Sequence, residues 1–428
     1  MQKINLKNTD ITVYHETLKN GLNVFIVPLK EKKAFYTSLY VKYGAVDNTF
    51  IPYGKNDSKT YPLGIAHFLE HKLFEQNDGT DAFKIFMENG ADANASTSYY
   101  YTNYLFSATS NIESNLIHLL NFVSEPHFTD ENILKEQGII EQELKMCLDD
   151  PYTMLYETSL YNTFINHPAK YAIGGTLESI KKITKETLYD SYNTFYNPKN
   201  MFLVITGNVS KKIINIIKEN QNKKVLDQNT IIKITTQEPR FVFKEYDELI
   251  FKTINVPKVI VNFKICLDDF KIDTFKLLNY FKLYFSVKYG ASSPINERLK
   301  QTSIISSNLL ADVERFDNYL IISVVGESYN YNKLIDEIIL ESKKRELEEY
   351  YFENKKRVHI SKKVSSTDSI YSVAYEIADD IINYNQVIDN KIDLIRSLNI
   401  NELREIVEKL NLDNKTVTVL KNEKSWFI

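Results

Sequence analysis

The sequence predicts an α+β chain made of two similar halves. Its 428 residues are enough for roughly three domains at about 150 residues each. Short β-branched runs bounded by turn residues alternate with longer segments of strong helix formers. An echo about half a chain apart links residues 103–107 (NYLFS) to residues 318–323 (NYLIIS), and each is followed by a Leu-Ile pair, Leu116-Ile117 and Leu334-Ile335. A repeat at that distance favours two related α/β halves.

The composition excludes several classes of protein. The chain is 43% hydrophobic, so it can bury a core, and its net charge of −4 gives no electrostatic reason to bind nucleic acid or anionic lipid. Its two cysteines exclude a disulfide scaffold and Cys-rich metal sites. The first residues lack the apolar region of a signal peptide, and no stretch approaches 18 uninterrupted apolar residues. We therefore expect no membrane span and a reduced cytoplasmic location.

The first half of the chain alternates between predicted strands and helices. Strands are predicted over residues 21–28 and 35–42, followed by a helix over residues 65–74 that contains strong helix formers and no breaker. The remaining segments are a turn (90–95), an aromatic-rich strand (96–109), two helices (112–124 and 130–146) and a closing strand (201–206).

The pattern weakens after residue 210 and then begins again. A Lys-rich helix over residues 211–222 leads into a polar run, and we place the linker within residues 210–248. New strands follow over residues 249–254 and 259–266. The predicted domains are residues 1–225 and residues 226–428.

Two of the seven histidines stand in one short motif, His67-Phe68-Leu69-Glu70-His71. On a helix, positions 67, 70 and 71 share a face, and two imidazoles one turn apart can bind one zinc ion. Glu70 would lie beside the open position of the metal and accept a proton from water there. This is the H-x-x-E-H order, the inverse of H-E-x-x-H. The alternative is a pair of helical histidines capped by a surface carboxylate, which chance produces once or twice in about a hundred such chains.

A third zinc ligand is predicted on the helix that contains Glu136 and Glu143. These carboxylates are two helical turns apart and share a face, and Ile139 and Ile140 near that face would bury it. Two carboxylates on a partly apolar face are costly unless a cation meets them. We predict Glu143 as the ligand and Glu136 as the group that orients a histidine or the attacking water. Without the histidines, a solvated helix face would be the better interpretation.

These residues resemble the active-site segments of the M16 (pitrilysin, inverzincin) zinc metallopeptidases. The resemblance covers residues 62–75 around the histidines, Asn94-Ala95-Ser96-Thr97 and residues 136–143. Gly174-Gly175-Thr176 and residues 196–201 fit later landmarks of the family. The sequence is similar to the short bacterial M16B proteins of the YmfH type. The similarity is strong over residues 20–210 and weak beyond.

The resemblance implies two homologous M16-type α/β domains, each a mostly antiparallel sheet with helices packed on one side, of which only the first has a zinc motif. It implies a zinc endopeptidase with His67, His71 and Glu143 as Zn²⁺ ligands and with Glu70 and Glu136 as catalytic residues. The substrate would be a short or unfolded peptide, such as a leader or precursor peptide, that adds as a strand beside Asn94, Ala95 and Thr97.

One feature departs from the family pattern. Active members hold substrate with an arginine and a tyrosine seven residues apart, and the corresponding positions here are Lys300 and Ser307, while Arg298 has Ile305 seven residues on. M16B proteins often divide the zinc site and this pair between two chains. We therefore predict the zinc-bearing subunit of a heterodimer, with a homodimer as the other arrangement. The alternative function is a non-catalytic peptide-binding or assembly subunit.

Overall fold

The computed structural model describes residues 1–77, 79–222 and 230–423. The chain forms two compact units, and both combine segments from the two halves of the sequence. Unit 1 comprises residues 1–144, 172–235 and 363–391, and unit 2 comprises residues 145–171, 236–362 and 392–428. The two compact units are discontinuous in sequence and so do not correspond to the predicted domains, residues 1–225 and 226–428. Those bounds stay a prediction.

Unit 1 is built on a seven-stranded sheet with the order β1-β2-β3-β9-β4-β8-β7. All neighbouring strands are antiparallel except β3 and β9, which are parallel. The bounds are β1 (Gln2–Asn5), β2 (Thr12–Thr17), β3 (Asn23–Pro28), β4 (Phe35–Val41), β7 (Ala91–Thr97), β8 (Thr102–Ala108) and β9 (Met201–Gly207), with a separate ribbon of β5 (Thr49–Phe50) and β6 (Lys59–Thr60).

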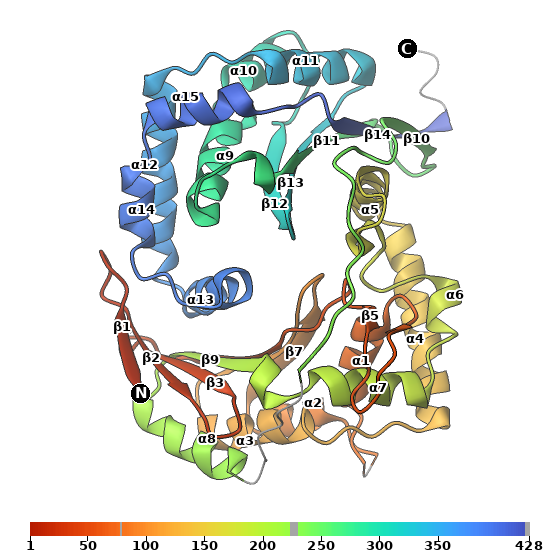
Figure 1. The fold of residues 1–428 in the computed structure, drawn as a ribbon, viewed down its shortest axis with the longest axis vertical. Helices are drawn as coiled ribbons and strands as arrows, with labels where there is room; N and C mark the ends of the chain where they lie inside the picture. Colours follow the sequence, from red (N-terminus) through yellow and green to blue (C-terminus); the bar gives the residue numbers. More distant parts are fainter. Residues whose placement is uncertain (78, 223–229, 424–428) are drawn as a thin grey trace. The chain divides into compact units, whose positions relative to one another are not determined.

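The central strands of unit 1, β3, β4 and β9, are buried on both faces. In β4, Leu39 and Val41 join the core beneath the helices, whereas Tyr36 and Tyr40 point to the opposite face. Most helices cover the first face, and α13 (Ile370–Tyr384) covers the second along β9 and β4 (Figure 1). The helices on the first side are α1 (Ile65–Leu73), α2 (Ala82–Glu88), α3 (Ile112–Phe122), α4 (Asp130–Leu148), α6 (Leu177–Ile180), α7 (Lys185–Phe195) and α8 (Ile214–Gln221), with single turns η1 (Pro168–Lys170), η2 (Pro198–Asn200) and η3 (Lys211–Ile213) elsewhere.

Unit 2 repeats the central strand arrangement of unit 1. Its five-stranded sheet has the order β10-β14-β11-β13-β12, with one parallel pair, β10 and β14, and antiparallel neighbours elsewhere. This matches β3-β9-β4-β8-β7 strand for strand, so the sequence echoes in β8 and β13 occupy equivalent places. The bounds are β10 (Tyr246–Ile250), β11 (Lys258–Cys266), β12 (Leu310–Phe316), β13 (Tyr319–Glu327) and β14 (Lys415–Lys421).

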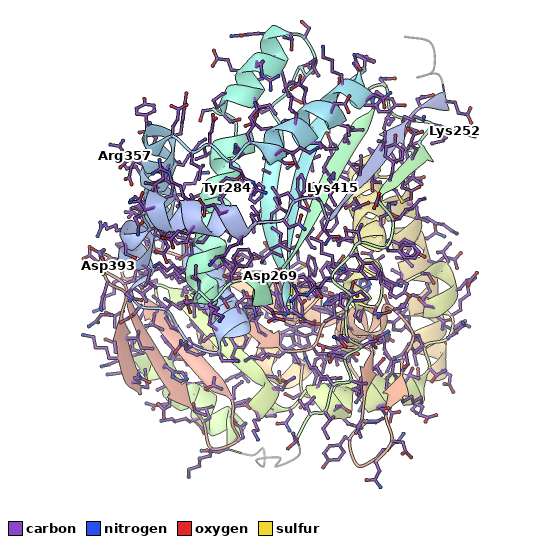
Figure 2. The ribbon with its side chains drawn as sticks, turned by 45° about the horizontal axis from the view of Figure 1, so that its top comes forward. Lys252, Asp269, Tyr284, Arg357, Asp393 and Lys415 are labelled. Carbon is purple, nitrogen blue, oxygen red and sulfur yellow. The ribbon has the colours of Figure 1, made fainter. Side chains whose placement is uncertain are left out.

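Helices also cover both faces of the second sheet. Tyr284, labelled in Figure 2, lies fully buried on α9 in the larger core of this unit. The opposite face receives α5 (Pro151–Thr163), which packs on β14 and β11. The other elements are α9 (Thr274–Tyr289), α10 (Pro294–Gln301), α11 (Tyr331–Lys343), α12 (Glu349–Ser366), α14 (Lys391–Ser397), α15 (Ile400–Lys409) and the turn η4 (Leu267–Asp269).

The structure corrects several predicted elements. Of the turn predicted over residues 90–95 only Gly90 is in a turn, because β7 spans Ala91–Thr97 and pairs along its whole length with β8. The strand predicted over residues 96–109 is two strand segments separated by the connection at residues 98–101. Small and polar residues have little strand preference of their own. The segment forms β7 because it pairs with the buried strand β8. Part of the predicted linker, residues 223–229, lies outside the described residues. No helix among the described residues is long and apolar enough to cross a membrane.

Candidate metal centre

Helix α1 presents the two histidines of the motif. Gly64 precedes it with φ of 83°, a left-handed conformation that glycine adopts without strain. A Cβ atom at Gly64 would collide with the backbone carbonyl of Gly174, so the loop at Gly174 reaches the beginning of the helix only because residue 64 lacks a side chain. Ile65, Phe68 and Leu69 are buried and hold α1 against the core, which leaves His67 and His71 on the partly exposed face.

Helix α4 brings Glu143 to these histidines. The Nε2 atom of His67 lies 3.6 Å from Oε1 of Glu143, and Nε2 of His71 lies 3.5 Å from Oε2 of the same carboxylate. One ligand atom from each of the three residues lies within 4.8 Å of the others. The structure therefore brings together the three residues predicted as zinc ligands, from two helices far apart in the sequence.

The donor set fits a tetrahedral zinc ion. Metal–ligand bonds of about 2.0–2.1 Å at tetrahedral angles separate neighbouring ligands by about 3.3 Å, close to the two His–Glu distances above. The interaction with His67 lowers the pKa of Glu143, so the carboxylate is charged, as a ligand must be. Two imidazoles and one carboxylate leave a fourth position open, as in catalytic zinc sites.

Glu136 orients His71. Its Oε1 atom lies 3.0 Å from Nδ1 of His71, and because a carboxylate only accepts hydrogen bonds, Nδ1 carries the proton and donates it. The lone pair of Nε2 then faces Glu143, as metal binding requires. Burial disfavours a proton on His71, but this hydrogen bond and the surrounding carboxylates outweigh it and raise the pKa of His71.

Glu70 is held next to the histidines from the neighbouring strand. The side chain is 7% exposed, and its Oε2 accepts a hydrogen bond of 2.8 Å from Oγ1 of Thr97 on β7. Burial raises the pKa of Glu70, against the opposing effect of the two histidines. A carboxylate with a raised pKa, fixed in orientation, is suited to accept and return a proton near neutral pH.

The predicted substrate-binding residues lie on the edge strand of the sheet. β7 is the last strand in the order, so one side of its backbone is available to a further strand. The backbone N–H of Ala95 donates to the side-chain oxygen of its neighbour Asn94. Thr97, at the end of the same strand, joins this edge to Glu70.

Sequence reasoning missed Lys72 at the site, named Gly174 only as a family landmark, and misjudged Ile139. Lys72 is fully buried and lies 3.8 Å from Glu136. The sequence feature that could have indicated it is a lysine directly after the predicted ligand His71, on the side of the helix that faces the core. A Cβ at Gly174 would lie 3.6 Å from Nδ1 of His67, a proximity that no local pattern shows. Ile140 is buried as predicted, but Ile139 is 47% exposed, because only one side of α4 contacts the core.

Comparison with known proteins places the chain among peptidases. The family model described as insulinase (peptidase family M16) matches residues 48–177, and the model described as the peptidase M16 inactive domain matches residues 182–358. The "uncharacterized zinc protease YmfH" of Bacillus subtilis is 40% identical over 332 residues, which are 76% of this chain and 77% of the relative. This chain belongs to the M16 peptidase family.

Other relatives of this M16 chain agree with that assignment. The zinc protease PqqE of Helicobacter pylori is 28% identical over 232 residues, 52% of this chain and 50% of the relative. A crystal structure of an M16-like peptidase from Alicyclobacillus acidocaldarius covers 98% of this chain and 100% of its own, with a TM-score of 0.91 and 27% identity. A protease from H. pylori shares the fold with a TM-score of 0.82 at 21% identity, over 96% of this chain and 99% of its own.

Proposed function

We propose that this M16 chain is a zinc-dependent endopeptidase that cleaves short or unfolded peptides. The observation that supports this most strongly is the convergence of His67, His71 and Glu143 with Glu70 beside them. When bound, zinc would supply a Lewis acid and a water that is nucleophilic at neutral pH. His67, His71 and Glu143 would hold it, and Glu136 would fix the tautomer of His71.

The remaining chemistry belongs to side chains of this chain. The peptide would add as a strand along β7, where backbone hydrogen bonds recognise extended chain independently of its sequence. Asn94, Ala95 and Thr97 are the proposed contacts, and the Asn94 side chain would leave the N–H of Ala95 when the peptide arrives. Glu70 would take a proton from the attacking water on its carboxylate and give it to the leaving amine, while Thr97 keeps the carboxylate in place.

Zinc analysis and one substitution test this function. Protein purified without chelators should contain close to one zinc per chain, and less than one-tenth would instead support a non-catalytic peptide-binding or assembly subunit. Glu70→Gln should retain zinc and lose cleavage of a fluorogenic peptide. Glu88→Gln, which changes an exposed carboxylate of α2, should retain both. Cleavage by Glu70→Gln at the wild-type rate would reject the role of Glu70.

We also propose that the chain acts as the zinc-bearing subunit of a two-chain enzyme. In unit 2, Lys300 and Ser307 are exposed and stand where the family has its arginine and tyrosine, while Arg298 is paired with Glu337 at 2.6 Å. A second M16-like chain would supply the missing pair. Full activity of the purified chain alone, as a homodimer, would overturn this proposal. The proposal includes a cytoplasmic location, with which the lack of a disulfide at Cys147 and Cys266 agrees, and cell fractionation tests that location.

A further inference from the structure

Lys72 is a buried cation with no part in the mechanism described above. It follows His71 on α1, and its side chain has no solvent exposure. A buried ammonium is stable only when anions or hydrogen-bond acceptors surround it. Two carboxylates meet it: Nζ lies 2.6 Å from Oε2 of Glu75 and 3.8 Å from Oε2 of Glu136.

The two oxygens of Glu136 have different partners. Oε1 is hydrogen-bonded to Nδ1 of His71, and Oε2 faces the ammonium of Lys72. The carboxylate therefore bridges a proposed zinc ligand and a buried cation, and it cannot rotate without losing one of them. Glu75 does not fix Glu136 in this way, because it lies beyond the end of α1 and its side chain is 31% exposed.

The charges around the site point to the same role. Glu70, Glu136 and Glu143 contribute three negative charges, and the zinc of the proposed function contributes two positive charges. Lys72 supplies positive charge from the buried side, where solvent cannot, and shares it between Glu136 and the more exposed Glu75. Without it, Glu136 would be an anion with 8% exposure that no described cation compensates from the side of Oε2.

We infer that Lys72 is a positioning residue for the metal centre: it holds Glu136 in the orientation that keeps the Nε2 lone pair of His71 directed at the metal. The inference rests on the proposed zinc site but concerns a residue outside it. Lys72 affects the metal only through Glu136. The inference therefore predicts that substitutions at residues 72 and 136 have non-additive effects on zinc affinity, and that a substitution at residue 75 has no effect on it.

The test measures zinc affinity of the metal-free chain by competition with a chromophoric chelator. Lys72→Met, similar in shape but uncharged, should weaken zinc binding by about 10- to 100-fold, the usual effect of losing a group that orients a ligand. Lys72→Arg keeps the charge and should stay within threefold of wild type. Glu75→Gln should also stay within threefold. Lys72→Met should lower the metal-free thermal midpoint, because Glu136 loses its buried counter-charge, so zinc affinity is measured well below the midpoint of every variant.

The double variant decides whether Lys72 acts through Glu136. In a Glu136→Gln background, Lys72→Met should cause no further loss of zinc affinity, because the group through which it acts is already neutral. Wild-type affinity in Lys72→Met, additive losses in the double variant, or an equal loss in Glu75→Gln would each overturn the inference. If Lys72→Met does not fold, Lys72→Arg and Glu75→Gln still test it, since a large loss in either contradicts it. A wild-type chain that binds no zinc would instead reject the proposed function.

Discussion

Single residues show how closely the metal centre depends on backbone shape. Gly138 lies within α4 between Glu136 and Glu143, and a Cβ there would meet nothing within 4 Å. Gly64 has a positive φ and lies against the backbone of Gly174. The two glycines therefore differ in role although each lies close to a metal-site residue, because only Gly64 is required by conformation and contact.

Alanine at these positions should have opposite effects. Gly138→Ala should stabilise the protein by about 0.5–1 kcal/mol, since glycine is the weaker helix former. Gly64→Ala should destabilise it by more than about 1 kcal/mol, because alanine is strained in the left-handed region and would also collide with the Gly174 carbonyl. Thermal unfolding of the metal-free proteins measures both. A Gly64→Ala protein as stable as Gly138→Ala would contradict the packing of Gly64 against the Gly174 loop.

Asp380 should make stability depend on pH. Burial raises the pKa of this carboxyl to about 6, although Lys391 lies 2.8 Å away and the N–H of Ile388 donates to it. A raised pKa means that the folded state binds the proton more tightly, so stability from this group is greatest below about pH 4 and falls as the pH rises to about 6. The difference between this pKa and that of an exposed aspartate corresponds to about 3 kcal/mol.

Asp380→Asn should remove that part of the pH dependence. Relative to wild type, the variant should gain stability between pH 4 and pH 6.5, measured as the difference in urea midpoints at the two values. Asp57→Asn, which changes an exposed carboxylate far along the chain from Asp380, is the control and should follow wild type. A variant that runs parallel to wild type over this range would show that Asp380 is ionised at all these pH values.

At the scale of elements, each sheet is completed by a helix from the other half of the chain. α13 buries Val373, Ala374 and Ile377 against β4 and β9, and α5 covers the equivalent strands of unit 2. The repeat accounts for this symmetry: β4 and β9 correspond to β11 and β14, so the same sheet face is covered in both units. The metal centre likewise needs α1, α4 and β7 together.

Removing apolar contact from α13 should destabilise unit 1. Ile377→Ala deletes a side chain that is 2% exposed and should cost about 2–4 kcal/mol, the usual range for such a truncation in a core. It should also increase proteolytic cleavage near residues 363–391. Asp379→Ala, on the exposed side of the same helix, should change either readout little. Unchanged stability in Ile377→Ala would mean that α13 does not complete this core.

For the whole molecule, the exchange of helices means that the two halves depend on each other to fold. A fragment of residues 1–225 would leave Val13, Phe25 and Phe202 on an uncovered sheet face, since their partners lie in residues 370–381. Exposed apolar faces of that kind promote association. We therefore expect the two halves of the chain to fold cooperatively, although they form two separate sheets.

Fragments should therefore fold only when combined. Residues 1–225 expressed alone should aggregate or lack a cooperative thermal transition, and co-expression with residues 226–428 should restore a stable complex. Size-exclusion chromatography and circular dichroism measure this. A stable, cooperatively unfolding monomer of residues 1–225 would contradict the dependence on α13.

The sequence by itself determined the chemistry of the candidate site and much of the alternation of elements. Helical spacing places positions 67, 70 and 71 on one face, and Glu136 and Glu143 on another, whatever surrounds them, because the period of a helix is local. The tertiary structure alone decided that these faces meet, that β7 is an edge strand despite its weak strand preference, and that α5 and α13 each cover a sheet built mainly from the other half of the chain. Lys72 shows the same division: its position in the motif is local, but its contact with Glu136 depends on how α1 packs against α4, which is set by burial of residues distant in sequence.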